Sequence, residues 1–157
     1  MEWERLIRFG LLGSTNLELY VILLARIALG LFFAISGGNK FFVASRRKAM
    51  YETLVAAKVP LPRPMTYLVS AVELVGGCLL IVGLLSSLFS LALLVDMLVA
   101  ILSTSLAAMP KGLSPLNWLD DFLYLPEPLY VLLFVWLICS GPGKFSVDYL
   151  IADRWLR

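Results

Sequence analysis

Four apolar stretches of this chain each carry an ionisable residue in or near the segment, namely Arg26, Glu73, Asp96 and Glu127. A charge at membrane depth costs roughly 2.5 to 3.5 kcal/mol on insertion scales, so such residues usually face a bundle interior and find partners there. Carboxylic acids and a guanidinium in that setting hold protons, pair with one another or polarise a bound small molecule. These four residues are therefore the first candidates for chemistry.

The composition indicates an integral membrane protein. Of its 157 residues, 61% are hydrophobic and only 15% are charged, and the mean hydropathy is +0.90. These values lie well above the balance of a soluble domain. The net charge is only +2 and the basic residues are scattered, so nucleic acid is not expected as a partner.

The apolar stretches are long enough to form four membrane spans, since about 20 residues cross a hydrocarbon core about 30 Å thick. The second and third are joined by a short Ser86-Ser87 turn, which makes them an antiparallel hairpin. We predict an all-α integral membrane four-helix bundle with both termini on one side. The predicted spans cover residues 17–37, 65–85, 88–109 and 128–140, the last borrowing 122–125 for length.

Short interfacial helices are expected around this bundle. Residues 1–16 form an N-terminal interfacial segment, 17–150 the membrane domain and 151–157 a C-terminal tail. In the long connection 38–64, Ser45 is expected to cap a helix over 46–57. This connection is strongly basic, which suits either ordinary snorkelling at the membrane edge or a lipid-specific or partner-docking role. Its cations are Lys40, Arg46, Arg47, Lys48, Lys58 and Arg63.

The depths of the buried charges suggest that they meet. At about 1.5 Å per residue, Arg26 and Asp96 lie about 13 and 12 Å from one membrane side, and Glu73 about 18 Å from it. Small residues share the helical face of each charge, as close packing in lipid requires. We therefore expect Arg26 to pair with Asp96 or Glu73. Glu127 is expected about a turn inside the membrane, within reach of Lys40.

Two interpretations of this polar cluster stay open. The first is a buried ion pair with a protonated carboxylic acid, which fixes only the register of the helices. The second is a polar pocket that binds a redox-active or proton-carrying small molecule. In the charge-pair interpretation Arg26→Leu destabilises the fold and a compensating Asp96→Asn restores it.

Other redox chemistry within the chain is not expected. Histidine is absent, so neither a histidine-ligated haem nor a histidine metal site is expected here. Cys78 and Cys139 lie in apolar spans without a C-x-x-C pattern, where thiols are usually inert small hydrophobes.

Several short motifs follow one another in a recognisable order along residues 17–150. They are RIALG at 26–30, KVPLP at 58–62, ELVGG at 73–77, PE at 126–127 and GPGKFSVD at 141–148. In this order and spacing the chain resembles the DoxX family, which includes the DoxD-type small subunit of thiosulfate:quinone oxidoreductase.

The resemblance implies a four-helix bundle in a bacterial or archaeal-type plasma membrane that associates with redox enzymes. In the best-defined case such an assembly passes electrons from a sulfur compound to quinone. Many members carry a histidine near the end of the third span, where this chain has Ser103, Thr104 and Ser105. A mechanism that needs a titrating imidazole there is therefore not expected.

Two functional hypotheses follow from the residues and the resemblance. In the first, the chain is a membrane subunit of a quinone-linked oxidoreductase. Its catalytic candidates are Arg26, Glu73 and Asp96, and Lys40 and Glu127 join them as candidate quinone-binding residues. In the second, it is a non-catalytic accessory subunit packed on a larger membrane complex. Both hypotheses expect other membrane or membrane-attached subunits and lipids as partners.

Overall fold

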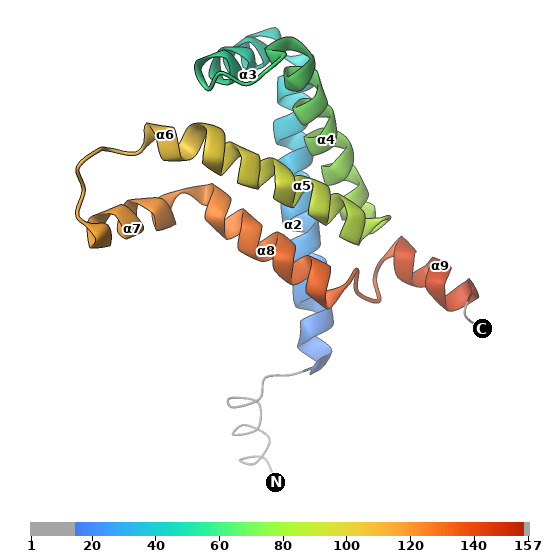
Figure 1. Ribbon diagram of the computed structural model, residues 1–157. Coiled ribbons are helices and arrows are strands. Elements are labelled where there is room, and N and C mark those ends of the chain that lie inside the picture. The colour runs from blue at the N-terminus through green and yellow to red at the C-terminus, as the bar shows by residue number, and fades with distance from the viewer. Residues whose placement is uncertain (1–14, 156–157) are drawn as a thin grey trace.

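The computed structural model describes residues 15–155, which form helices joined by turns, with no strand among them (Figure 1). Three stretches are long and apolar enough to cross a membrane: Leu17–Phe42, Pro62–Val82 and Ser86–Ala108. The prediction of an all-α, multi-pass membrane protein is confirmed. The predicted interfacial segment 1–16 falls almost entirely outside the described residues. The helices are α2 (Thr15–Phe42), α3 (Ala44–Ala56), α4 (Pro62–Val82), α5 (Ser86–Ala100), the π-helical η1 (Ile101–Ser105), α6 (Leu106–Ala108), α7 (Pro115–Tyr124), α8 (Pro126–Ser140) and α9 (Val147–Trp155).

Helices α2 and α4 run side by side with their backbones in contact (Figure 1). A Cβ atom added to Gly77 would lie 2.3 Å from the backbone nitrogen of Ala34, and one added to Gly37 would lie 2.4 Å from that of Leu74. Gly30 similarly meets the carbonyl of Gly77. Because glycine lets backbones approach closely in lipid, these residues set the register of the pair. The prediction that the small-residue faces are the packed faces is confirmed for α2 and α4, whereas on α5 the face of Asp96 includes Val99, which is 51% exposed.

A second pair, α5 and α8, lies across the first (Figure 1). Its fully buried Leu93 and Phe134 join Phe33 of α2 in one core. The rings of Phe33 and Phe134 lie 5.3 Å apart between centroids, and Tyr130 meets Phe33 edge-on at 5.4 Å. This interlocking of aromatic rings holds the two helix pairs together.

The turn between α4 and α5 lies earlier than the predicted Ser86-Ser87 turn. Gly83 ends α4 with a φ of +74°, a conformation that glycine adopts without steric cost, and its N–H bonds the Leu79 and Leu80 carbonyls. Ser86 is then the first residue of α5. The turn lies inside an apolar run that has no polar break, so Gly83 was the residue in the sequence that could have indicated it.

The first span is longer than predicted, and α3 begins without the predicted serine cap. Helix α2 continues through Phe42, so Lys40 belongs to the span rather than to the loop. The break is Val43 alone, and Ser45 lies inside α3 instead of capping it. No side chain caps this end, because the backbone runs almost directly from α2 into α3, where Arg47 N–H bonds the Val43 carbonyl.

The predicted fourth span is bent. Helix α8 carries the expected centre at 128–140, but the borrowed residues 122–125 belong to α7 and its end, and the two helices meet at 67°. Pro126 starts the new helix, and the residue before a proline is driven out of the helical conformation. A fourth crossing therefore needs α7 and α8 to act as one broken span.

The glycine contacts generate a stability prediction. Gly77→Ala should destabilise the fold by about 1–3 kcal/mol, because its methyl group meets the α2 backbone rather than a movable side chain. Gly38→Ala is the matched control, since its Cβ meets only the end of the Leu74 side chain at 3.6 Å. Thermal unfolding in detergent measures both, and equal stabilities would contradict the backbone contact.

Candidate functional site

Arg26 is buried, at 2% exposure, but it pairs with neither predicted carboxylate. Its guanidinium donates hydrogen bonds to the carbonyls of Pro142 and Phe145. The predicted pairing with Asp96 or Glu73 is therefore wrong. The reason is register: Gly37 is the α2 residue at the level of Glu73, and Arg26 lies eleven residues earlier, about 16 Å along the helix.

The segment 141–148 is folded back onto the α4–α5 turn and onto Arg26. The carboxylate of Asp148 accepts hydrogen bonds from the N–H groups of Leu85 and Ser86, at 2.7 and 2.8 Å, and so caps α5. Its own N–H donates to the Gly83 carbonyl at 2.9 Å. Asp148 also attracts the Arg26 guanidinium electrostatically. This cluster is a structural clasp that fixes the C-terminal segment to the bundle.

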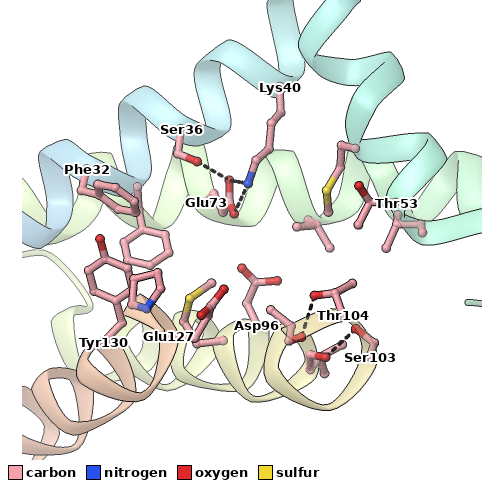
Figure 2. A pocket seen from close by; sticks show the side chains of 18 residues that line it. Phe32, Ser36, Lys40, Thr53, Glu73, Asp96, Ser103, Thr104, Glu127 and Tyr130 are labelled. Carbon is pink, nitrogen blue, oxygen red and sulfur yellow. Dashed lines mark hydrogen bonds and ion pairs between the residues drawn. The ribbon is translucent and has the colours of Figure 1, made fainter. Parts of the chain in front are cut away.

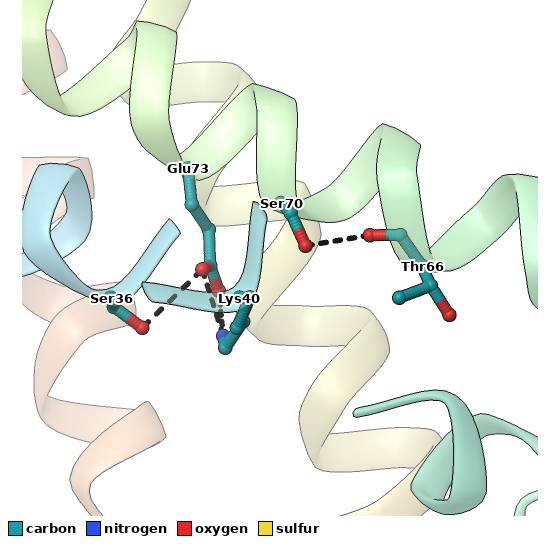
Figure 3. Close-up of polar contacts among 5 residues, drawn as sticks. All are labelled: Ser36, Lys40, Thr66, Ser70 and Glu73. Carbon is teal, nitrogen blue, oxygen red and sulfur yellow. Dashed lines mark hydrogen bonds and ion pairs between the residues drawn. The ribbon is translucent and has the colours of Figure 1, made fainter. Parts of the chain in front are cut away.

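Glu73 is instead paired with Lys40, the residue that the longer α2 brings into the bundle (Figure 3). The Lys40 Nζ atom lies 2.6 and 2.8 Å from the two carboxylate oxygens, and the Ser36 hydroxyl lies 3.4 Å from one of them. The Glu73 side chain is 3% exposed and that of Lys40 26%. The ion pair therefore joins α2 to α4 at the edge of a cavity.

A cavity of about 230 Å³ lies between the α2–α4 pair and the α5–α8 pair (Figure 2). Lys40 and Glu73 stand on one wall, and Asp96 and Glu127 face them from the other. Four of the five candidate binding residues thus surround one space, while Arg26 lies outside it. The remaining lining residues are Phe32, Phe33, Ser36, Met50, Thr53, Leu54, Val69, Met97, Val99, Ala100, Ser103, Thr104, Pro126 and Tyr130.

Asp96 and Glu127 each bring an unsatisfied oxygen to this cavity. Asp96 Oδ2 and Glu127 Oε2 are buried without a hydrogen-bond partner among the described residues. Lys40, which was expected within reach of Glu127, is held by Glu73. Burying a carboxyl oxygen without a hydrogen-bond partner costs free energy. Protonation of each carboxylate, or a hydrogen bond from a ligand to its free oxygen, would lower that cost.

The Lys40 ammonium has donor capacity left for a ligand. An ammonium has three N–H donors, and two serve the Glu73 oxygens. The cavity thus combines one charge-assisted donor with two carboxyl groups that are open to a proton or a hydrogen-bonding ligand. Aromatic rings close its other end, where Phe32 and Tyr130 lie 4.8 Å apart between centroids. Such a site suits a flat ring with polar atoms at its edge.

Several lining residues were not among the sequence candidates. Tyr130 lies one turn after Glu127 on α8, a spacing that puts both on one helical face. Ser103 and Thr104 lie on η1, and their hydroxyls donate to the carbonyls of Val99 and Ala100. Short π-helical turns inside spans are frequent at functional sites. The polar run 103–105 was the sequence signal for this turn.

Comparison with known proteins agrees with the sequence resemblance. The DoxX family model matches residues 21–106, more than half of the chain. An uncharacterised membrane protein of Mycobacterium tuberculosis is 28% identical over 137 residues, covering 85% of this chain and 82% of that protein. No solved structure matches. The matched region includes Lys40, Glu73 and Asp96 but ends before Glu127 and Tyr130.

The clasp predicts how Arg26 responds to mutation. Arg26→Leu should destabilise the protein by roughly 1–3 kcal/mol for each carbonyl left unsatisfied, and should speed trypsin cleavage after the exposed Lys144, because the released segment can enter the protease more readily. Adding Asp96→Asn should restore nothing, because the two residues share no contact. Thermal unfolding and limited proteolysis measure this, with the exposed Arg46→Leu as control. Restoration by Asp96→Asn would contradict the clasp.

The Lys40–Glu73 pair predicts a coupled loss. Glu73→Gln alone should cost about 3 kcal/mol, at the low end for a buried pair because Lys40 is partly exposed, and Lys40→Met added to it should recover part of that loss. The exposed Lys48–Glu52 pair, 3.8 Å apart, is the control and should contribute at most about 0.5 kcal/mol. A double-mutant cycle in detergent measures both couplings. Equal couplings would show that burial does not strengthen the interaction between Lys40 and Glu73.

Proposed function

The chain belongs to the DoxX family of membrane proteins, and on that premise we propose that it is the membrane subunit of a quinone-linked redox assembly in the plasma membrane. Its cavity between the two helix pairs receives the headgroup of the quinone. The electrons come from an associated redox subunit that oxidises a reduced substrate, with a sulfur compound as the first candidate. This chain contributes the binding site and the protons.

The observation that carries the proposal is the pair of unsatisfied carboxyl oxygens facing the Lys40 ammonium across one cavity. A quinone ring presents a carbonyl oxygen at each of two opposite edges. Lys40 can donate its remaining N–H to one carbonyl, and the carboxyl of Asp96 or Glu127, when protonated, can donate to the other. The buried acids that lack partners within the chain would thus gain them from the ligand.

The size and surface of the cavity also support a headgroup. Its volume of about 230 Å³ is below the roughly 300–1,000 Å³ of sites that enclose a whole drug-sized ligand. A single substituted ring fits this space, and an isoprenoid tail would extend into the lipid. Phe32 and Tyr130, packed against each other, supply an aromatic wall at one end of the cavity.

Reduction of a quinone to the quinol takes up two electrons and two protons. Asp96 and Glu127 are the proposed proton donors, and each then takes up a new proton from water. Glu73, already satisfied by Lys40, keeps the ammonium in place and acts as a positioning residue. Arg26 has no part in this step, because it lies outside the cavity and its guanidinium is bound to the C-terminal segment.

Isosteric removal of the acids tests the proposal. Asp96→Asn and Glu127→Gln, made in the assembly purified with its partners, should each leave the retained quinone within about 3-fold and lower quinone-dependent electron transfer on the order of 100-fold, because an amide can donate a hydrogen bond to the quinone but cannot deliver its proton. The exposed Asp120→Asn is the control and should change neither quantity. Quinone is quantified by extraction and chromatography, and integrity by gel filtration.

Two results would overturn the proposal. If the assembly is intact but neither variant changes quinone content or electron transfer, the cavity is architecture and the chain is an accessory subunit. If no redox partner co-purifies with the wild type and the wild type retains no quinone, the proposal of a quinone-linked function is wrong.

A further inference from the structure

A second cavity lies between α3 and the beginning of α4. Its volume is about 330 Å³. Three cations converge on it from the two helices, Arg47 and Lys48 from α3 and Arg63 from α4, and no carboxylate lines it. We call this site the basic groove. Its other lining residues are Ala44, Tyr51, Thr66 and Tyr67.

Arg47 is fixed in the basic groove by the protein itself. Its Nη1 donates to the Phe41 carbonyl at 2.7 Å, and its Cζ lies 5.6 Å from the centroid of the Tyr67 ring. A stacked guanidinium with one donor used keeps the rest of its planar fork for an anion. A cation that merely snorkels to water has no such fixed geometry.

The charge of the groove is not neutralised by the protein. Glu52 approaches Lys48 only to 3.8 Å, and these side chains are 62% and 77% exposed, so the pair contributes little. Arg63 is exposed, and none of the residues from 15 to 155 forms an ion pair with it at 4 Å or less. Together with the N-terminal end of α4, these cations create a strongly positive recess.

The position of the basic groove points to a lipid. It lies where α2 ends at Phe42 and α4 begins at Pro62, and these are neighbouring ends of two candidate membrane spans (Figure 1). Large apolar side chains beside it are exposed, with Phe42 at 73%, Leu61 at 69% and Leu68 at 54%. A ligand here meets cations at one end and acyl-chain contacts at the other.

We propose that the basic groove binds the phosphate of an anionic phospholipid headgroup. The Arg47 fork and Arg63 pair with the phosphate oxygens, and Lys48 contributes charge at the mouth. The half-exposed ring of Tyr67 packs against the glycerol portion, and the acyl chains follow the apolar surface beside Leu68. The site is separate from the quinone-linked cavity and does not depend on it.

Native mass spectrometry of the full chain, equilibrated in detergent with equimolar phosphatidylglycerol and phosphatidylcholine, tests the proposal. The wild type should retain phosphatidylglycerol preferentially. Arg47→Gln with Arg63→Gln should lower that preference at least about 10-fold, because two charge-assisted contacts are lost. Arg46→Gln with Lys58→Gln is the control: it removes the same charge from exposed residues outside the groove, and should change the preference less than about 3-fold.

The single Arg63→Gln variant separates loss of binding from loss of folding, because Arg63, unlike Arg47, donates to no backbone carbonyl among residues 15–155. It should fold and still lose about 5-fold of the preference. Equal losses in the groove and control variants would overturn the proposal in favour of diffuse surface attraction. Displacement of the lipid by millimolar glycerol 3-phosphate would overturn the lipid assignment in favour of a free phosphate ester, and no preference in the wild type would overturn the site.

Discussion

The backbone contact between α2 and α4 is the constraint on which the rest of the structure depends. Gly37 and Gly77 bring the two helices so close that neither can slide past the other without a steric clash. In a bilayer, where apolar side chains gain little from leaving lipid, such close packing is the main source of helix association. The register set in this way decides which charges meet.

That register divides the polar residues into a closed centre and an open one. Around Arg26 the guanidinium is bound to backbone carbonyls and the α4–α5 turn is capped by Asp148, while Arg26 Nε and the Ser86 hydroxyl have no hydrogen-bond partner among the described residues. Around Lys40 and Glu73 the ion pair is formed, but the facing Asp96 and Glu127 keep unsatisfied oxygens at a cavity. The cavity is what distinguishes the two centres. Arg26 binds a segment of the chain itself, whereas Asp96 and Glu127 line an open space, and we therefore propose ligand binding only at the second centre.

Helix α4 connects the proposed quinone cavity with the basic groove at the membrane edge. Glu73, Ser70 and Thr66 are all buried along one of its faces, and Thr66 lines the groove at the far end of this row (Figure 3). The hydroxyls donate to carbonyls one turn back, at Thr66 and Pro62, so the row is satisfied without water. A headgroup in the groove and a ligand in the cavity would therefore be held by one rigid helix.

The sequence by itself determined the class of this protein, its family and the surfaces that pack. Hydrophobic length identified the spans, the small residues at Gly30, Gly37 and Gly77 identified the packed faces, and Glu73 and Asp96 were recognisable as charges at depth. These features are local, because composition and helical spacing can be read along the chain. Motif order likewise required no structure.

Only the tertiary structure decided which charge meets which. The predicted span boundaries could not identify the partner of Glu73. Helix α2 continues five residues beyond the predicted end at Gly37, to Phe42, and so includes Lys40, which pairs with Glu73 in place of Arg26. The clasp of Arg26 onto Pro142 and Phe145 joins residues more than a hundred positions apart, and backbone carbonyls leave no signature in a sequence. Pairing inside a bundle is a matter of register to within one turn, and close backbone packing fixes that register only when the helices have met.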